Sequence, residues 1–196
     1  MPPKKSAAKE IPAKQLVALV SEQWKREVPG GYLPKICDSL KLLSDDEIWW
    51  RPNDPSNSVG NLVLHLCGNM RQWIISGLGG AKDVRKRDVE FSEKGPIPRD
   101  KLIAQLRETV REASAVVTRL SAADLVRSYS IQGYDVTGYE ASIHVTTHFA
   151  YHAGQIIYVA KMKRAADLGF TKLPPLPAAK QQPAKQPRGS AFPIDI

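Results

Sequence analysis

Histidines are the residues of this chain best suited to chemistry, and three of the four are closely spaced. His144, His148 and His152 follow one another at intervals of four, and the fourth histidine is His65. On a helix of 3.6 residues per turn this spacing places three imidazoles along one side. Imidazoles one turn apart can bind the same metal ion, but the outer two, about 12 Å apart along the axis, cannot. The ligand pair is therefore either His144 with His148 or His148 with His152.

The pattern of apolar residues favours the second pair. A seam that contains His148 and His152 is otherwise apolar apart from one glutamine, which is typical of a stripe that faces a core. Its members are Ala141, Val145, His148, His152, Gln155, Val159 and Met162. A seam through His144 and His148 instead collects Thr137, Tyr151 and Gln155. Two histidines on a core-facing stripe each need a partner once buried, and this favours a metal over two ordinary histidines on an amphipathic helix.

His65 is the predicted third ligand. It lies in an apolar-periodic stretch, residues 59–78, on a seam with Leu62, Asn69 and Trp73, so it faces the same way as the core residues. Cys67, two residues away, falls on roughly the opposite side of that helix. No acidic residue obviously completes a closed set of four. Three protein ligands with one open position is the arrangement of catalytic zinc sites.

The elements that must hold these histidines are helices. Apolar residues recur at helical spacing in residues 15–27, 33–43, 59–78 and 98–120, and Thr137 with Glu140 forms a capping box that begins the histidine helix. We expect Pro29-Gly30-Gly31 to break the first helix, and short turns to follow Ser44 and Ser121. Residues 81–97 form a charged loop, long enough to cover a site, and 129–136 a second loop. The sequence predicts an all-α, four-helix bundle without strands.

Length, composition and charge define the rest of the chain. With 196 residues and 42% hydrophobic content, one globular domain with a real core is expected. There is no apolar run long enough to span a membrane and no secretory signal, so we expect a cytoplasmic protein without membrane contact. Two cysteines, Cys37 and Cys67, make no disulfide framework and fit small buried hydrophobes.

The net charge of +8 is concentrated at the two ends of the chain. Residues 1–14 carry +3 and residues 173–196 carry +2, and both segments are rich in Pro, Lys, Ala and Gln. Such segments bury too little apolar surface to offset the entropy of ordering. We therefore expect disordered tails at 1–13 and 173–196 around a bundle domain at 14–172, and we do not expect a nucleic-acid partner.

Two motifs give the chain a family resemblance. Asn57-Ser-Val-Gly-Asn-Leu-Val-Leu-His65-Leu and His148-Phe-Ala-Tyr-His152-Ala-Gly-Gln-Ile resemble motifs of the DinB-like (YfiT-like) metal-binding four-helix bundles. The likeness spans about residues 15–172. Arg71-Gln-Trp-Ile and residues 85–91 and 131–136 are similar to one uncharacterised branch of that superfamily. The resemblance implies that His65, His148 and His152 hold one divalent metal ion, zinc or nickel first, with iron and manganese as alternatives.

The resemblance also implies a choice of functions. Some superfamily members are thiol S-transferases and others resemble hydrolases, so we expect a metal-dependent reaction on a small molecule such as a low-molecular-weight thiol. A non-catalytic, metal-binding stress-response bundle is the alternative. Asn69, His144 and Gln155 are candidates to orient ligands or substrate, and no catalytic residue can be named. The superfamily's habit, together with aromatics expected to be exposed at Trp49 and Trp50, predicts a homodimer.

Overall fold

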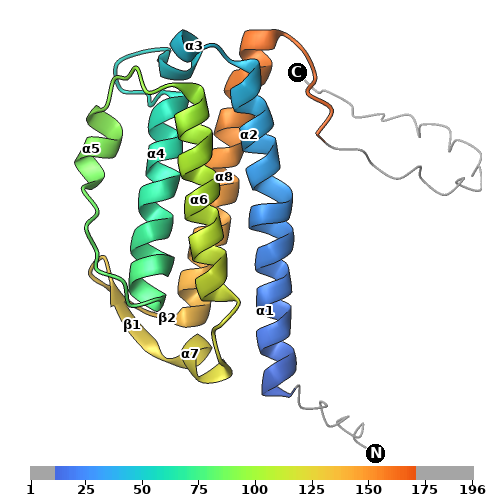
Figure 1. The fold of residues 1–196 in the computed structure, drawn as a ribbon, viewed down its shortest axis with the longest axis vertical. Helices are drawn as coiled ribbons and strands as arrows, with labels where there is room; N and C mark the ends of the chain where they lie inside the picture. The colour runs from blue at the N-terminus through green and yellow to red at the C-terminus, as the bar shows by residue number, and fades with distance from the viewer. Residues whose placement is uncertain (1–11, 171–196) are drawn as a thin grey trace, which may run out of the picture.

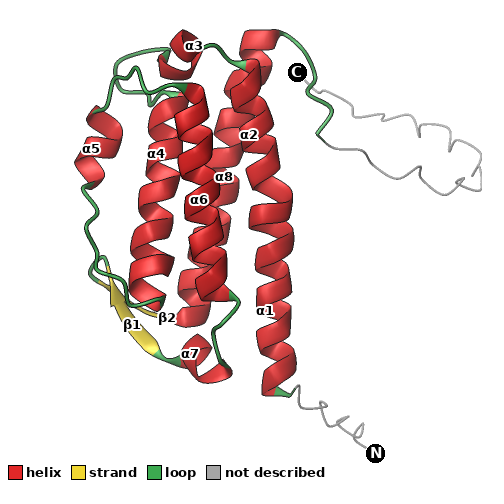
Figure 2. Cartoon of the chain, in the orientation of Figure 1, coloured by secondary structure: helices red, strands yellow, loops and turns green. Residues whose placement is uncertain are grey.

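Four long helical segments lie side by side and form the body of the molecule (Figures 1 and 2). The structure, a computed structural model, describes residues 12–170, so nearly all of both predicted tails lies outside the described residues. The segments are α1 (Ala13–Glu27) with α2 (Leu33–Leu42), α4 (Val59–Met70), α6 (Arg99–Val117) and α8 (Gly138–Arg164). The predicted four-helix bundle is confirmed.

The first helix does not break at Pro29-Gly30-Gly31, contrary to the expectation from the sequence. Val28–Tyr32 forms a π-helical turn, η1, in which the Leu33 N–H donates to the Val28 carbonyl, and α1 and α2 continue along one line in Figure 1. A Cβ at Gly30 or Gly31 would lie 2.9 Å from the carbonyl oxygen of Lys25 or Arg26. The two glycines therefore allow the widened turn to pass the proline without ending the helix.

The long connection between α4 and α6, the second and third long segments, is a crossover. A short α3 (Asp45–Trp49) caps one end of the bundle, and α4 then runs to the other end, where a second π-helical segment, η2 (Arg71–Leu78), extends it. The chain returns along the outside of α4, so α6 starts again at the α3 end and runs parallel to α4 (Figure 1). This return contains a helix that the sequence did not indicate, α5 (Arg87–Ser92).

A β-hairpin occupies the segment expected to be an irregular loop. After α7 (Ala122–Val126), strands β1 (Ser128–Ile131) and β2 (Tyr134–Thr137) pair antiparallel, with Ser128 opposite Thr137 and Ile131 opposite Tyr134. Gln132 and Gly133 form the two-residue turn with φ of 56° and 82°. Such turns need positive φ at both positions, and Gln-Gly is a weaker signal for them than Asn-Gly or Asp-Gly. Thr137, the last residue of β2, then caps α8.

Serine and threonine caps begin four helices. Each cap side chain accepts a hydrogen bond from the backbone N–H three residues on, and the backbone N–H of the cap residue donates to that residue's side chain; the caps are Ser44, Ser58, Ser121 and Thr137. These boxes satisfy backbone donors that would otherwise have no partner. All the long segments contribute to one core, whose large buried side chains include Trp24, Ile36, Leu40, Leu66, Met70, Leu102, Leu106, Phe149 and Ile156.

Trp49 and Trp50 are half-buried and not exposed, which corrects one basis for the expected dimer. The Trp49 ring covers Gly60 and Gly95, where an added Cβ would lie 2.6–2.8 Å from ring atoms, and its Nε1 donates to the Ile97 carbonyl at 3.2 Å. The Lys163 ammonium lies 3.6 Å above the centre of the Trp50 ring. Cys37 and Cys67 are buried free thiols, as expected. Among the described residues, no helix combines the length and apolarity that crossing a bilayer requires.

Candidate metal centre

The histidines of α8 lie beside its buried stripe and not on it, which corrects the seam drawn from the sequence. His144, His148 and His152 are half-buried, whereas Gln155 and Met162 are exposed. Small residues on several sides of this helix conceal the true stripe, because alanine and glycine give little contrast between faces. The buried residues are Gly138, Ala141, Ser142, Val145, Phe149, Ala153, Ile156 and Ala160.

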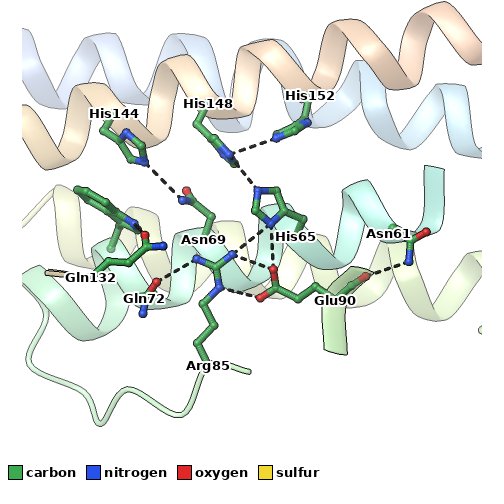
Figure 3. Close-up of polar contacts among 11 residues, drawn as sticks. Asn61, His65, Asn69, Gln72, Arg85, Glu90, Gln132, His144, His148 and His152 are labelled. Atoms are coloured by element: carbon green, nitrogen blue, oxygen red, sulfur yellow. Dashed lines mark hydrogen bonds and ion pairs between the residues drawn. The ribbon is translucent and has the colours of Figure 1, made fainter. Parts of the chain in front are cut away.

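Three histidine rings nevertheless meet between α4 and α8, as Figure 3 shows. His65 Nε2 lies 3.1 Å from His148 Nε2, and His152 Nε2 lies 3.1 Å from the same atom. One ring nitrogen from each histidine lies within 4.8 Å of the other two, and His65 is only 7% exposed. The structure therefore brings together the three residues that the sequence singled out.

The far nitrogens of two rings are held by oxygen acceptors. His65 Nδ1 lies 2.9 Å from Glu90 Oε2, and His152 Nδ1 lies 2.7 Å from Gln155 Oε1. Because an ionised carboxylate and an amide oxygen only accept, these two bonds place the proton on each Nδ1 and leave each Nε2 its lone pair. Arg85 Nη2 also lies 3.2 Å from His65 Nδ1, but its shorter bond, at 2.8 Å, goes to Glu90 Oε2. This outer bond fixes the tautomer and orientation of a metal-binding histidine. Gln155 thus lies where a residue that orients His152 would lie, and its role stays a prediction.

Glu90 was not found from the sequence, because it is one of several charged residues in the crossover and lies 25 positions from His65. Arg85 donates to both its oxygens, Nε at 2.7 Å and Nη2 at 2.8 Å. Burial raises the pKa of Glu90, but the hydrogen bonds from Arg85 and His65 outweigh it and leave the pKa below its ordinary value. Glu90 is therefore an anion at neutral pH, although it is only 8% exposed.

The approach of Glu90 to α4 depends on Gly68. A Cβ at Gly68 would lie 1.9 Å from Glu90 Oε1 and 2.6 Å from its carboxyl carbon. Asn61, fully buried, donates to the backbone carbonyls of Glu90 and Glu93 at 2.9 and 2.8 Å. Gly68 therefore provides the space for the carboxylate. Asn61 holds the segment that carries it, through the bond to Glu90 drawn in Figure 3. Residues 81–97, expected from the sequence to be able to cover a site, thus place the Glu90 carboxylate against His65.

The three converging nitrogens suit a cation better than a proton. His148 Nε2 faces two lone pairs and can donate only one proton, and its Nδ1 is buried with no hydrogen-bond partner among the described residues. Burial first, and the neighbouring histidines second, lower the pKa of His148 to about 3. Tetrahedral zinc with Zn–N bonds near 2.05 Å would need nitrogens about 3.3 Å apart, close to the two separations of 3.1 Å. These residues could together hold a metal ion.

His144 and Asn69 lie next to the trio. The His144 ring stacks on Trp73 with 4.0 Å between centroids, and its Nε2 lies 3.5 Å from the Asn69 amide nitrogen. Burial lowers the pKa of His144, so the ring is neutral at pH 7. Both side chains line a cavity of about 490 Å³ that reaches His65 and His148 and is bounded by the hairpin residues Gln132, Tyr134 and Val136. The unpredicted hairpin thus forms one wall of the site.

A second cavity reaches the histidines from the other end of α8. It measures about 710 Å³ and includes His65 and His152 among its walls. Most of its other walls are aromatic or apolar and come from the segment after α3, from α5 and from the second half of α8. The candidate centre therefore lies between two cavities that differ in character.

A comparison with protein families gives a match over most of the chain. A family model described as "Protein of unknown function (DUF1572)" matches residues 32–175, which include all four histidines and Glu90. The chain belongs to this family. No curated protein matches the DUF1572 chain at a significant level.

Two solved structures share the fold of this DUF1572 protein. A DinB-like protein from Bacillus cereus has a TM-score of 0.57 at 15% identity, covering 74% of this chain and 90% of its own. The DinB-like protein YjoA from Bacillus subtilis has a TM-score of 0.56 at 15% identity, covering 76% and 94%. The DinB-like fold expected from the two histidine motifs is confirmed.

Proposed function

We propose that the protein is a metal-dependent enzyme that acts on a small molecule at a three-histidine centre. His65, His148 and His152 would hold one divalent ion, zinc or nickel first and iron or manganese next. The observation that carries the proposal is the pair of outer hydrogen bonds, from His65 to Glu90 and from His152 to Gln155. They aim two unprotonated nitrogens at the point that His148 also faces, as metal sites require.

The reaction class follows from the donor set. Three neutral nitrogens would leave the charge of a bound ion uncancelled and would leave a four-coordinate ion able to take one further ligand. Such an ion stabilises a thiolate or acidifies a water molecule, which supports thiol transfer or hydrolysis. The chain itself would orient its ligands through Glu90 and Gln155. Asn69 and His144 would contact the substrate in the cavity that they line.

Cobalt substitution tests for the open position. Cobalt(II) prefers similar ligands to zinc, and its visible spectrum reports a change of ligand directly. We expect metal-free protein to take up one equivalent of cobalt, and titration with 2-mercaptoethanol then to alter the spectrum in a saturable way. A variant with His148→Ala should show neither change. A cobalt spectrum that does not respond to the thiol or to azide would indicate a closed site and the non-catalytic alternative.

A turnover measurement separates the two reaction classes. The zinc- or nickel-loaded protein should consume either a low-molecular-weight thiol with an electrophilic acceptor or an activated ester, and the metal-free protein neither. His148→Ala should abolish the activity and His144→Ala should lower it with the metal still bound. Loss of metal from the His144→Ala protein would contradict its placement as a substrate contact.

A further inference from the structure

The residues that line the second cavity are mainly apolar and include no acidic side chain. Its apolar walls include Trp50, Phe91, Tyr158 and Val159. The first cavity also borders Arg87, but it contains the Glu140 carboxylate, and its Arg85 is already neutralised by Glu90. The two spaces on either side of the centre would therefore accept different chemical groups.

Arg87 supplies positive charge to the second cavity. Its guanidinium carbon lies 4.8 Å from the centre of the Phe91 ring. Arg87 takes part in none of the ion pairs formed among residues 12–170. An arginine that rests on an aromatic ring keeps its hydrogen-bond donors available to a carboxylate. The cavity thus combines a free guanidinium with a mainly apolar lining.

Aromatic side chains at the cavity have large exposed areas. Tyr151 and Tyr158 are 66% and 68% exposed, and Met162 is 48% exposed. With Gln155 they recur at three- and four-residue spacing along α8, on the same cavity as His152. Apolar surface of this kind, gathered around a concave site of about 710 Å³, matches the usual size and lining of small-molecule sites.

We propose that this cavity binds an amphiphilic organic anion, a carboxylate with an aromatic-sized apolar body. The carboxylate would pair with Arg87 and approach the ion held by His65 and His152, and the apolar body would lie against Trp50 and Tyr158. Two positive charges would hold the carboxylate: Arg87 and the metal ion. The second of them rests on the proposed function. The contribution of Arg87 does not depend on the ion.

The test uses naphthylacetate and its neutral isostere, naphthylacetamide, with the full-length protein. Calorimetric titration should show saturable binding of the acid to the zinc-loaded protein, at least about tenfold tighter than that of the amide. Arg87→Gln should weaken binding of the acid by about tenfold or more, with and without zinc. Tyr158→Ala should weaken it about fivefold, and Tyr134→Ala, in the other cavity, should leave it unchanged. Unchanged melting temperatures would show that the variants fold.

The outcomes separate this inference from the proposed function. Zinc binding together with equal affinity for the acid and the amide would overturn the inference alone. A larger loss from Tyr134→Ala than from Tyr158→Ala would place the acid in the first cavity and would also overturn it. Arg87-dependent binding of the acid by a protein that takes up no zinc would support the cavity and contradict the metal centre.

Discussion

The carboxylate of Glu90 determines how His65 presents its lone pair. Glu90→Gln keeps the shape of the side chain but removes the charge that Arg85 and His65 share. We expect zinc affinity to fall about 10- to 100-fold, the usual effect of removing an outer hydrogen-bond partner. Calorimetric titration with zinc measures this loss directly.

Alanine substitution of two glycines tests the role of Glu90 without changing Glu90 itself. Gly68→Ala should weaken zinc binding as Glu90→Gln does, because the new methyl group would displace the carboxylate. Gly154→Ala, on the exposed side of α8, meets no atom within 4 Å and should leave zinc binding unchanged. It should also stabilise the helix by up to about 1 kcal/mol. Equal zinc affinity in the two variants would contradict the role of Glu90.

Protonation of the histidine cluster should make the metal-free protein acid-sensitive. Burial lowers the pKa of His144, His148 and His152 below the ordinary 6.5, and that of His148 reaches about 3. Above pH 6.5 these rings are neutral in both states, and their contribution to stability is fully present. As the pH falls below 6.5 the unfolded chain takes up protons that the folded protein does not, so stability is lost. His148 alone should cost about 2 kcal/mol between pH 7 and 5.

Urea unfolding of metal-free protein across this pH range measures the effect. His148→Gln should flatten the dependence of the unfolding free energy on pH, because glutamine does not titrate. A dependence as steep as that of the unchanged protein would show that other groups cause the acid sensitivity.

At the scale of elements, the crossover helix α5 depends on one buried asparagine. The Asn61 oxygen accepts from the Ser58 N–H and hydroxyl and from Arg51, and its amide nitrogen donates to two carbonyls of the α5 segment. Asn61→Ala leaves the Glu90 carbonyl without its donor and the Glu93 carbonyl with Arg51 alone, at 3.3 Å, and should cost about 2–4 kcal/mol of unfolding free energy. Amide hydrogen exchange in α5 should accelerate.

The exposed Asn53 is the control for this prediction. Its side chain accepts from Ser56 in a similar turn, but it has no buried carbonyl to satisfy. Asn53→Ala should cost less than about 1 kcal/mol and leave the exchange of α5 unchanged. Similar losses for the two variants would mean that Asn61 acts only as a helix cap.

The sequence predicted correctly those elements whose signals lie within the element itself. Apolar spacing located the long helices, and Ser44 and Thr137 marked helix starts through their own side chains. The hairpin was missed because Gln132-Gly133 is a weak turn signal. A helix break was wrongly predicted because two glycines accommodate Pro29 in a π-helical turn. His65, His148 and His152 could be found by spacing and resemblance. Glu90 could not, because only the path of the crossover brings it to His65.

At the scale of the whole molecule, the homodimer stays a prediction, now with a specific surface. Four apolar side chains line one cavity of about 370 Å³ and are 43%, 56%, 47% and 37% exposed: Leu16 and Leu19 of α1, and Tyr139 and Ile143 of α8. Exposed apolar patches of this kind mark interaction surfaces. We expect light scattering to give the mass of two chains, and Leu19→Glu to give the mass of one without loss of helical circular dichroism.

Val84 provides the control for the dimer. It is 72% exposed on the crossover, away from this patch, so Val84→Glu should leave the dimer intact. A monomeric mass for the unchanged protein at micromolar concentration would contradict the prediction.

The central claim is that three histidines share one metal ion, and zinc titration of the metal-free protein tests it most directly. We expect about one equivalent to bind and to raise the melting temperature, because a ligand bound only to the folded state stabilises it. Alanine at His65, His148 or His152 should weaken binding by more than about 100-fold, and His144→Ala by less than about tenfold. The metal-free protein should stay folded on its own apolar core. A protein that binds no zinc, nickel, iron or manganese, or equal losses from His144→Ala and His152→Ala, would contradict the account.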